Sequence, residues 1–344
     1  MRRNSGLQAA RAVACLGVLI GHAAHSAGGL SGQQPPPWLV QQLPTFGVYL
    51  FFVLSGCVMG GIVRSREGVR GFVVSRFLRI YPPLWGAVAL YYVLAFVEGK
   101  TIPTLEPKTL ALWPLVERSI EMYDIPLWTL HYELAFYLLV AGFIALKLPK
   151  WTVAASLGIW AAIIVGLDAA FGQLYFHVLP GAYLPVSCLN LLFIAGMLVA
   201  LLDIRLLRMS TVVLIGIAIS VWLIAAYADT VPKRLPVLWL YLASMCFALL
   251  AFSRFQRVPA PIVRVGNASY GIYLVHFILI DLLCRQLRGA GVALGFWPSL
   301  PIIAGFALML AFAYGATEFA AYKWIKERMR AGTRWPRRLL PVPA

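Results

Sequence analysis

Ten apolar segments of about 20 residues each constrain what this chain can fold into more than any other feature of its sequence. A helix of that length crosses the hydrocarbon core of a bilayer, and it satisfies its backbone hydrogen bonds internally, as lipid requires. Hydrophobic residues make up 61% of the 344 residues and charged residues 12%, which excludes a soluble enzyme. The sequence therefore predicts an all-α integral membrane protein with about ten transmembrane helices. The predicted segments are 7–27, 43–63, 79–98, 127–147, 151–171, 184–202, 209–228, 236–253, 269–287 and 300–325.

The distribution of Lys and Arg predicts how these helices are oriented. Of the 29 basic residues, 21 fall at the chain ends and in the alternate connections that would share one side of the membrane, against 7 on the other side. Connections rich in Lys and Arg stay in the cytoplasm, so both termini are predicted to be cytoplasmic. The net charge of +16 is thus interpreted as charge that orients helices, and no nucleic-acid partner is expected. Residues 1–330 are predicted to form a single transmembrane domain, with a basic cytoplasmic tail at 331–344.

The five cysteines indicate neither a disulfide framework nor a metal site, because all fall in apolar segments and lack the spacing of metal ligands. The first apolar segment carries Arg11, is long enough to span the membrane and lacks a convincing cleavage site, so no cleavable signal peptide is expected. The longest connection, roughly 99–126, is expected on the outer side, as a lid or as a loop that faces a substrate.

Two ionisable residues, Arg11 and His22, lie inside the first apolar segment. Their spacing of 11 residues places them on the same side of a helix, roughly 16 Å apart along its axis. A charge at bilayer depth costs at least ~2.5 kcal/mol, so such residues usually mark a functional site. His22 is predicted to lie in the outer half of the helix, and an imidazole satisfied by a neighbouring helix is the alternative. His25, one turn further on, is expected near the outer surface as a supporting, structural or solvated group.

The segment from Pro126 to Glu133 opens the fourth apolar stretch from the outside. We predict that Glu133 lies at a depth similar to that of His22 and pairs with it, because a carboxylate inside the membrane needs a partner or a proton. Such a pair is suited to taking a proton from a hydroxyl nucleophile. The alternative is that Glu133 pairs with an Arg and ties two helices together. Trp128 and His131 are candidate supporting residues, although Trp128 alone is typical of the aromatic belt at a membrane interface.

Arg76 and Arg79 are three residues apart, so they share one face of a helix where the third apolar segment begins. Arginine presents a fork of donors that suits phosphate oxygens, and we predict that this pair binds an anion. Positive charge that only orients the helix is the alternative interpretation. Tyr81 follows the pair, and Pro82 and Pro83 are expected to distort the start of the helix.

Two further segments carry weaker signals. Ser55 and Gly56 lie inside the second apolar segment, where small residues allow the close approach of a helix or of a slender ligand. The ninth segment contains Tyr270 and a third intramembrane histidine, His276. Asp281 lies five residues beyond His276, too far round the helix to pair with it directly.

Taken together, these segments resemble acyltransferase family 3 of membrane proteins. The resemblance extends from Arg11 to SYGIYLVHF at 269–277 and rests on four motifs in order: Arg11 with ten residues before His22, FFVLSG at 51–56, RFLRIYPP at 76–83 and WTLHYELAFY at 128–137. The opening of the chain most resembles the exopolysaccharide acetyltransferase branch. The sequence departs from the family pattern at Thr129, where Ser is usual, and at Cys57, where Phe is usual.

The resemblance implies an O-acyltransferase of the bacterial inner membrane. Members move an acyl group, usually acetyl, from cytoplasmic acyl-CoA to a hydroxyl of a glycan or a lipid-linked sugar, typically on the outer side. By this resemblance His22 is the essential histidine, Glu133 is the carboxylate of the fourth-segment motif, and Arg76 and Arg79 form the paired-arginine motif associated with the CoA nucleotide. The other positions it implies for cofactor contact or support are Arg11, Ser55, Gly56, Tyr81, Tyr270 and His276. Whether His22 deprotonates the acceptor or itself accepts the acyl group stays open.

A secondary transporter is the main alternative from another functional class. Intramembrane histidines and carboxylates are equally typical of proton relays, and His22, Glu133, His276 and Asp281 could form one. Transporters usually contain internal repeats with interrupted helices at matching positions, and this sequence has no second copy of the Arg–His or Arg–Arg elements. A binding role, such as a lipid carrier, is a third interpretation.

Overall fold

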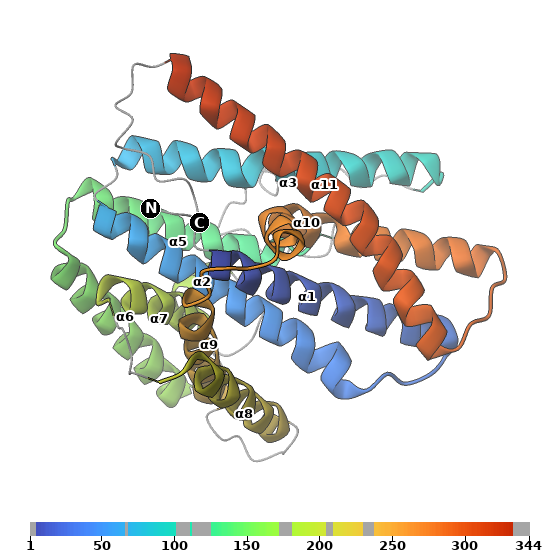
Figure 1. The fold of residues 1–344 in the computed structure, drawn as a ribbon, viewed down its shortest axis with the longest axis horizontal. Coiled ribbons are helices and arrows are strands. Elements are labelled where there is room, and N and C mark those ends of the chain that lie inside the picture. The colour runs from blue at the N-terminus through green and yellow to red at the C-terminus, as the bar shows by residue number, and fades with distance from the viewer. Residues whose placement is uncertain are drawn as a thin grey trace.

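The computed structural model describes residues 5–65, 68–100, 111, 125–171, 181–203, 209–229 and 237–332. This part of the chain is a bundle of helices without strands, and a helix lies in each of the ten predicted segments (Figure 1). The helices are α1 (Ser5–Ser31), α2 (Leu43–Ser65), α3 (Val69–Val97), α5 (Leu127–Ala145), α6 (Lys150–Phe171), α7 (Asn190–Leu201), α8 (Thr211–Asp229), α9 (Val237–Ser253), α10 (Ala260–Gly289) and α11 (Phe296–Gly332). The predicted tail at 331–344 lies almost wholly outside the described residues.

Eight of the helices in the described residues are long and apolar enough to cross a membrane, by length and composition. The other two, α7 with 12 residues and α9 with 17, are shorter. A helix of 12 residues rises about 18 Å, which is less than the ~30 Å hydrocarbon core of a bilayer. A short 3₁₀ turn at Gly181–Val186 precedes α7, where the sequence predicted a continuous helix from 184.

The helices α3 and α10 begin well before their predicted starts at 79 and 269. The physical reason is that hydropathy marks the apolar part of a helix, whereas the backbone hydrogen bonds continue into the polar residues beside it. Pro82 and Pro83 therefore lie inside α3, and the prediction that they distort its start is wrong. The hydroxyl of Tyr314 on α11 donates a hydrogen bond to the carbonyl of Pro83, which ties α11 to this part of α3.

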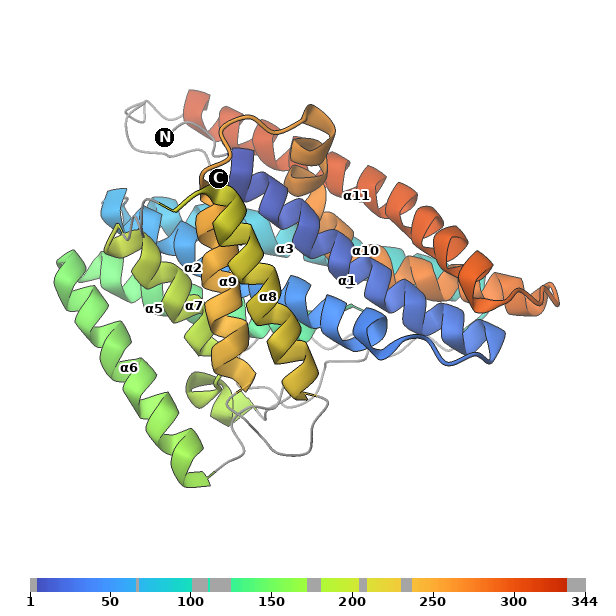
Figure 2. The same ribbon diagram turned by 60° about the horizontal axis from the view of Figure 1, so that its bottom comes forward.

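The first helix lies at the centre of the bundle, beside α2, α10 and α11 (Figures 1 and 2). Small residues allow this close packing, and Ala10, Ala14 and Ala23 are fully buried. α1 and α10 run in the same direction, because Gly266 lies against the backbone of Gln8 near both helix starts and the ring of His276 lies beside that of His22 further along both helices. Residues at similar distances from the two helix starts therefore lie side by side.

Glycines on both helices allow α2 and α7 to pack backbone against backbone. A Cβ on Gly56 would collide with the carbonyl of Phe193, and a Cβ on Gly196 would collide with the carbonyl of Val53. Neither helix can move aside without disturbing the buried residues around it, so these positions require glycine. Gly56, which the sequence offered as a cofactor contact, therefore faces α7.

Replacing Gly56 with alanine is expected to lower the free energy of unfolding by about 1–3 kcal/mol, the usual cost of overpacking a core. Gly61→Ala on the same helix is the matched control, because a Cβ there meets no atom within 4 Å. Alanine favours a helix over glycine by up to ~1 kcal/mol, so the control should be neutral or slightly stabilised. Thermal unfolding of both purified variants in detergent measures the difference, and equal stability would contradict the α2–α7 packing described above.

Candidate active site

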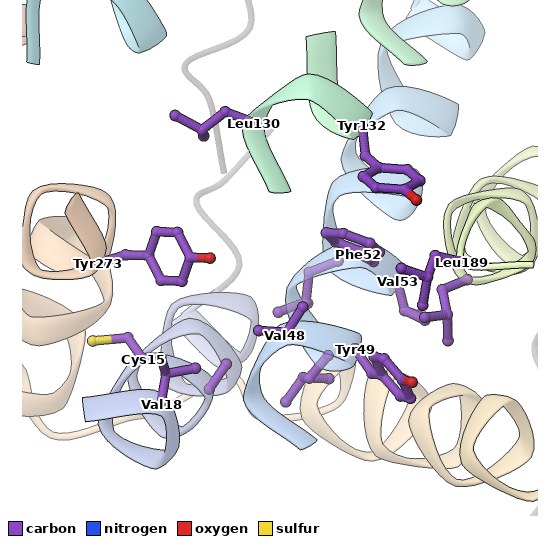
Figure 3. Packing of buried hydrophobic residues seen from close by; sticks show 14 of the residues in the cluster. Cys15, Val18, Val48, Tyr49, Phe52, Val53, Leu130, Tyr132, Leu189 and Tyr273 are labelled. Atoms are coloured by element: carbon purple, nitrogen blue, oxygen red, sulfur yellow. The ribbon is translucent and has the colours of Figure 1, made fainter. Parts of the chain in front are cut away.

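A cavity lies between the helices, and its walls come from α1, α2, α3, α5, α7 and α10. Apolar and aromatic side chains form most of the walls, and Figure 3 shows Tyr273 pointing from α10 towards Val48 and Phe52 on α2. The charged side chains in the walls are three arginines and one glutamate. The cavity is lined by Leu7, Arg11, Val48, Phe51, Phe52, Leu54, Ser55, Val58, Met59, Arg76, Arg79, Ile80, Thr129, Leu130, Glu133, Tyr137, Phe193, Ser269, Tyr270 and Tyr273.

Arg79 is held rigidly in this wall. Its Nη1 forms an ion pair of 2.9 Å with Oε1 of Glu318 on α11, and both side chains are largely buried. The guanidinium group also lies over the ring of Tyr270, at 5.1 Å from the ring centre, and over Tyr322 at 5.8 Å. A buried cation is tolerated when it is paired and stacked in this way. Much of the charge of Arg79 is therefore balanced by Glu318.

Arg76, one turn earlier on α3, has a different environment. Its guanidinium group lies near the rings of Phe72 and Tyr137, at 5.8 and 5.5 Å from their centres. Its Nε is buried without a hydrogen-bond partner, and no carboxylate of the described residues lies within ion-pair distance. Tyr137 and Glu133 interact with this guanidinium group electrostatically, but neither forms an ion pair with it. Arg76 thus brings to the cavity a positive charge that a bound anion could pair with directly.

Glu133 and Arg11 provide the remaining charges of the cavity wall. Glu133 accepts hydrogen bonds from the hydroxyl of Ser55, at 2.8 Å, and from the hydroxyl of Tyr137. The Nε of Arg11 donates a hydrogen bond of 3.2 Å to the hydroxyl of Ser269, and Arg11 interacts electrostatically with Glu133. The carboxylate is therefore satisfied by hydroxyl groups and by a positive charge nearby, as a buried anion must be.

The predicted pair of His22 and Glu133 does not form. His22 is absent from the cavity wall, and its ring instead lies 5.2 Å from the rings of His276 and Phe277 on α10. Glu133 lies at the level of Arg11, and Arg11 is about 16 Å from His22 along α1. The structure therefore separates the two groups that the sequence placed together.

The error arose from the depth at which α5 begins. The prediction assumed that this helix starts at the membrane surface, but the hydroxyl of Thr129 in its first turn hydrogen-bonds to the hydroxyl of Tyr273, at 2.9 Å, halfway along α10. Ile125, just before the helix, is only 2% exposed. The chain therefore enters the bundle before α5 starts, and Glu133 lies deeper than a count from the surface suggests.

The structure also places the other predicted supporting residues. Trp128 is half-buried, with its ring 6.4 Å from that of Phe52. His131 is buried, and its Nδ1 lies 3.0 Å from the carbonyl oxygen of Leu127, outside the cavity wall. His25 is exposed. None of these three lines the cavity, so the supporting roles of Trp128, His131 and His25 stay predictions.

Tyr81 points away from the cavity. Its ring stacks on Phe77, with 4.8 Å between ring centres, and its hydroxyl donates a hydrogen bond of 2.9 Å to the carbonyl of Ala111. Ala111 belongs to the connection at 99–126 that was predicted to lie outside as a lid, and most of that connection is not among the described residues. This hydrogen bond places Ala111 beside the middle of α3.

Several residues of the site were not singled out in the sequence. Tyr137, Tyr273 and Ser269 line the cavity, and aromatic or small residues in apolar segments give no signal of such a role. Glu318 did carry a signal, because it is the only acidic residue between 300 and 325. An isolated carboxylate in an apolar segment calls for a partner, and Arg79 provides it.

Comparison with known proteins identifies the family of this chain. Residues 4–318 match the family model Acyl_transf_3, described as an acyltransferase domain. The chain is 27% identical to the acyltransferase MdmB of Streptomyces mycarofaciens, over 73% of this chain and 72% of that protein. It is also 27% identical to the exopolysaccharide production protein ExoZ of Rhizobium meliloti (strain 1021), over 72% of this chain and 79% of that protein. No solved structure gives a significant match.

The family match covers nearly the whole chain, including every helix that lines the cavity. The apolar helices described above agree with a multi-pass integral membrane protein. The chain therefore belongs to acyltransferase family 3, and it is a membrane-embedded O-acyltransferase.

Proposed function

We propose that this enzyme transfers an acetyl group from acetyl-CoA, bound from the cytoplasmic side, to a hydroxyl of a cell-envelope or exported glycan or glycolipid. The observation that carries the proposal is the cavity, in which three arginines meet otherwise apolar walls. A bacterial inner membrane, with the acceptor on its outer side, is the setting that this reaction requires. The name of the relative ExoZ, an exopolysaccharide production protein, supports a polysaccharide acceptor.

The donor fits the cavity by its chemistry. Coenzyme A combines an anionic nucleotide with a slender pantetheine arm that ends in the thioester. Arg76, which has no carboxylate partner among the described residues, is the group that gains most from a phosphate, and Arg11 and Arg79 add positive charge beside it. All three come from the parts of α1 and α3 that the charge distribution assigns to the cytoplasmic half. An extended arm bridges much of the rise of about 16 Å from Arg11 to His22 along α1.

Glu133 forms a polar cluster with the hydroxyls of Ser55 and Tyr137 in the cavity wall. In the proposed complex the pantetheine arm extends past this cluster. Thr129 and Tyr273 line the cavity and hydrogen-bond to each other, and the ring of Tyr273 lies 5.8 Å from that of His276. In the proposed reaction the contact between Thr129 and Tyr273 marks the end of the cavity towards His22. This contact opens when the thioester reaches His22. His22 then removes the proton of the acceptor hydroxyl, or it accepts the acetyl group before the acceptor does.

Turnover of radiolabelled acetyl-CoA by the purified protein in liposomes tests the donor. We expect the protein to release free CoA slowly without an acceptor and faster with a glycan acceptor, and label should appear on envelope glycans of cells that overproduce it. Liposomes that contain the Gly61→Ala variant serve as an active control, and empty liposomes serve as the blank. Absence of both acyl-CoA binding and turnover, for acetyl-CoA and for longer acyl-CoAs, would overturn the proposal and make proton-coupled uptake the next assay.

A further inference from the structure

The imidazole of His276 is buried beside His22, and the reaction proposed above gives it no role. The residue is 1% exposed, and its Nδ1 lies 2.7 Å from the carbonyl oxygen of Tyr273 on its own helix. A carbonyl oxygen can only accept, so Nδ1 carries the proton and Nε2 carries a lone pair. That Nε2 is buried and has no hydrogen-bond partner among the described residues.

An unsatisfied buried acceptor costs about 1–3 kcal/mol, and a hydrogen bond from a neighbouring donor would remove that cost. The ring closest to His276 among those it contacts is that of His22, with 5.2 Å between ring centres and an angle of 46° between ring planes. This separation is within reach of a hydrogen bond made directly after a small rotation or through one water molecule. His22 is only partly buried, so its other edge remains available to a substrate.

We infer that His276 is the positioning residue of His22: a protonated ring nitrogen of His22 donates a hydrogen bond to Nε2 of His276, which directs the opposite, unprotonated nitrogen of His22 towards the acceptor hydroxyl. The inference rests on the proposed function. In the step, the hydroxyl proton moves to His22 as the hydroxyl oxygen attacks the thioester carbon. The carbon–sulfur bond then breaks, and the departing sulfur takes the proton from His22, which gives the acetyl ester and free CoA.

A neutral histidine thus takes the place that a carboxylate holds in a serine-protease triad. The consequence is that the imidazolium form of His22 is stabilised through a hydrogen bond and not through an opposite charge. The helices packed on α1 are the short helix Trp38–Gln42, α2, α9, α10 and α11, and among their described residues only His276 on α10 interacts with His22 as an ionisable group. Within the described residues, the ionisable groups that act on His22 are His276 and, on its own helix, His25.

The test compares the pH dependence of acetyl-CoA turnover in His276→Leu, His276→Gln and His276→Asp with that of the wild type. We expect His276→Leu to lower kcat by about 10- to 100-fold with little change in KM. This loss is smaller than the full contribution of a general base, because His22 itself remains. His276→Gln keeps an acceptor oxygen and should recover part of the loss. His276→Asp should move the rising limb of the pH profile to higher pH, because a carboxylate keeps His22 protonated further up the pH range. Ser299→Ala is the matched control, since it also removes a buried unpartnered polar atom but lies on α11.

A second measurement does not require activity. Diethyl pyrocarbonate modifies neutral imidazole, and tandem mass spectrometry distinguishes modification at His22 from that at exposed His25 in the same peptide. In His276→Asp the pH at half-maximal modification of His22 should rise while that of His25 stays unchanged. If the protein never turns over acyl-CoA but this shift is observed, the proposed function is refuted while the interaction between His22 and His276 is supported. Turnover in the wild type, with equal losses in the Leu and Gln variants and no shift in either assay, would overturn the pair alone.

Discussion

Replacing His22 with alanine is expected to lower the rate of acyl transfer by about 10²- to 10⁴-fold, the usual contribution of a general acid–base group. The affinity for acyl-CoA should stay unchanged, because His22 is not part of the cavity wall that would hold the nucleotide. The rate of acyl transfer and the affinity for acyl-CoA together distinguish a chemical role of His22 from a structural one. Single-turnover rates with radiolabelled acetyl-CoA give the first, and binding to the detergent-solubilised variant gives the second.

The same variant distinguishes the two possible routes. If His22 accepts the acetyl group before the acceptor does, brief incubation of the wild type with labelled acetyl-CoA should leave label on the peptide that contains His22. If His22 acts only as a base, that peptide stays unlabelled while the product forms. A His22→Ala enzyme with the rate of the wild type would exclude both routes and remove His22 from the reaction.

Replacing Arg76 with methionine is expected to weaken acetyl-CoA binding by about 10- to 100-fold, the equivalent of one charge-assisted hydrogen bond of about 1.5–3 kcal/mol. The loss should shrink as salt is added, because salt also weakens the contact in the wild type. Arg76→Lys, which keeps the charge but loses the planar fork, should bind with intermediate affinity. Isothermal titration at low and high salt measures these differences.

Arg70→Met is the matched control, because Arg70 lies on the same helix and is exposed. The thermal stability of the ligand-free protein supplies a further check. Arg76 is partly buried, and its buried Nε has no hydrogen-bond partner and the side chain no ion-pair partner among the described residues, so its removal should leave the unfolding temperature unchanged or raise it. A destabilised Arg76→Met protein with the CoA affinity of the wild type would assign Arg76 to the fold and not to the ligand.

The helices were predictable because the physics of lipid leaves few choices. An apolar segment of bilayer length must be helical, and each of the ten segments contains a helix. The helix bounds were less predictable, since α3 and α10 extend into polar sequence that hydropathy does not mark. The length of α7 depends on the 3₁₀ turn before it, which the apolar composition of 184–202 does not reveal.

The sequence predicted which charged residues form the site, but it did not predict which of them interact with one another. Arg11, Arg76, Arg79 and Glu133 all reach the cavity, because charges inside a membrane bundle turn away from lipid. Their partners depend on the depth of each helix, and α5 starts far inside the bundle. The sequence before Leu127 has no periodicity that would have indicated this depth.

The hydrogen bond between Thr129 and Tyr273 also bears on the electrical insulation of the membrane. Each elementary charge that leaks across a potential of 100 mV dissipates about 2.3 kcal/mol, so an enzyme that joins reactants from opposite sides must not provide a conducting path. The cavity wall contains the arginines but neither His22 nor His276, and Val18 and Leu19, which lie between Arg11 and His22 on α1, are almost fully buried. In the proposed reaction the thioester occupies the opening for as long as the contact between Thr129 and Tyr273 is broken. The substrate itself then blocks the passage of ions during each turnover.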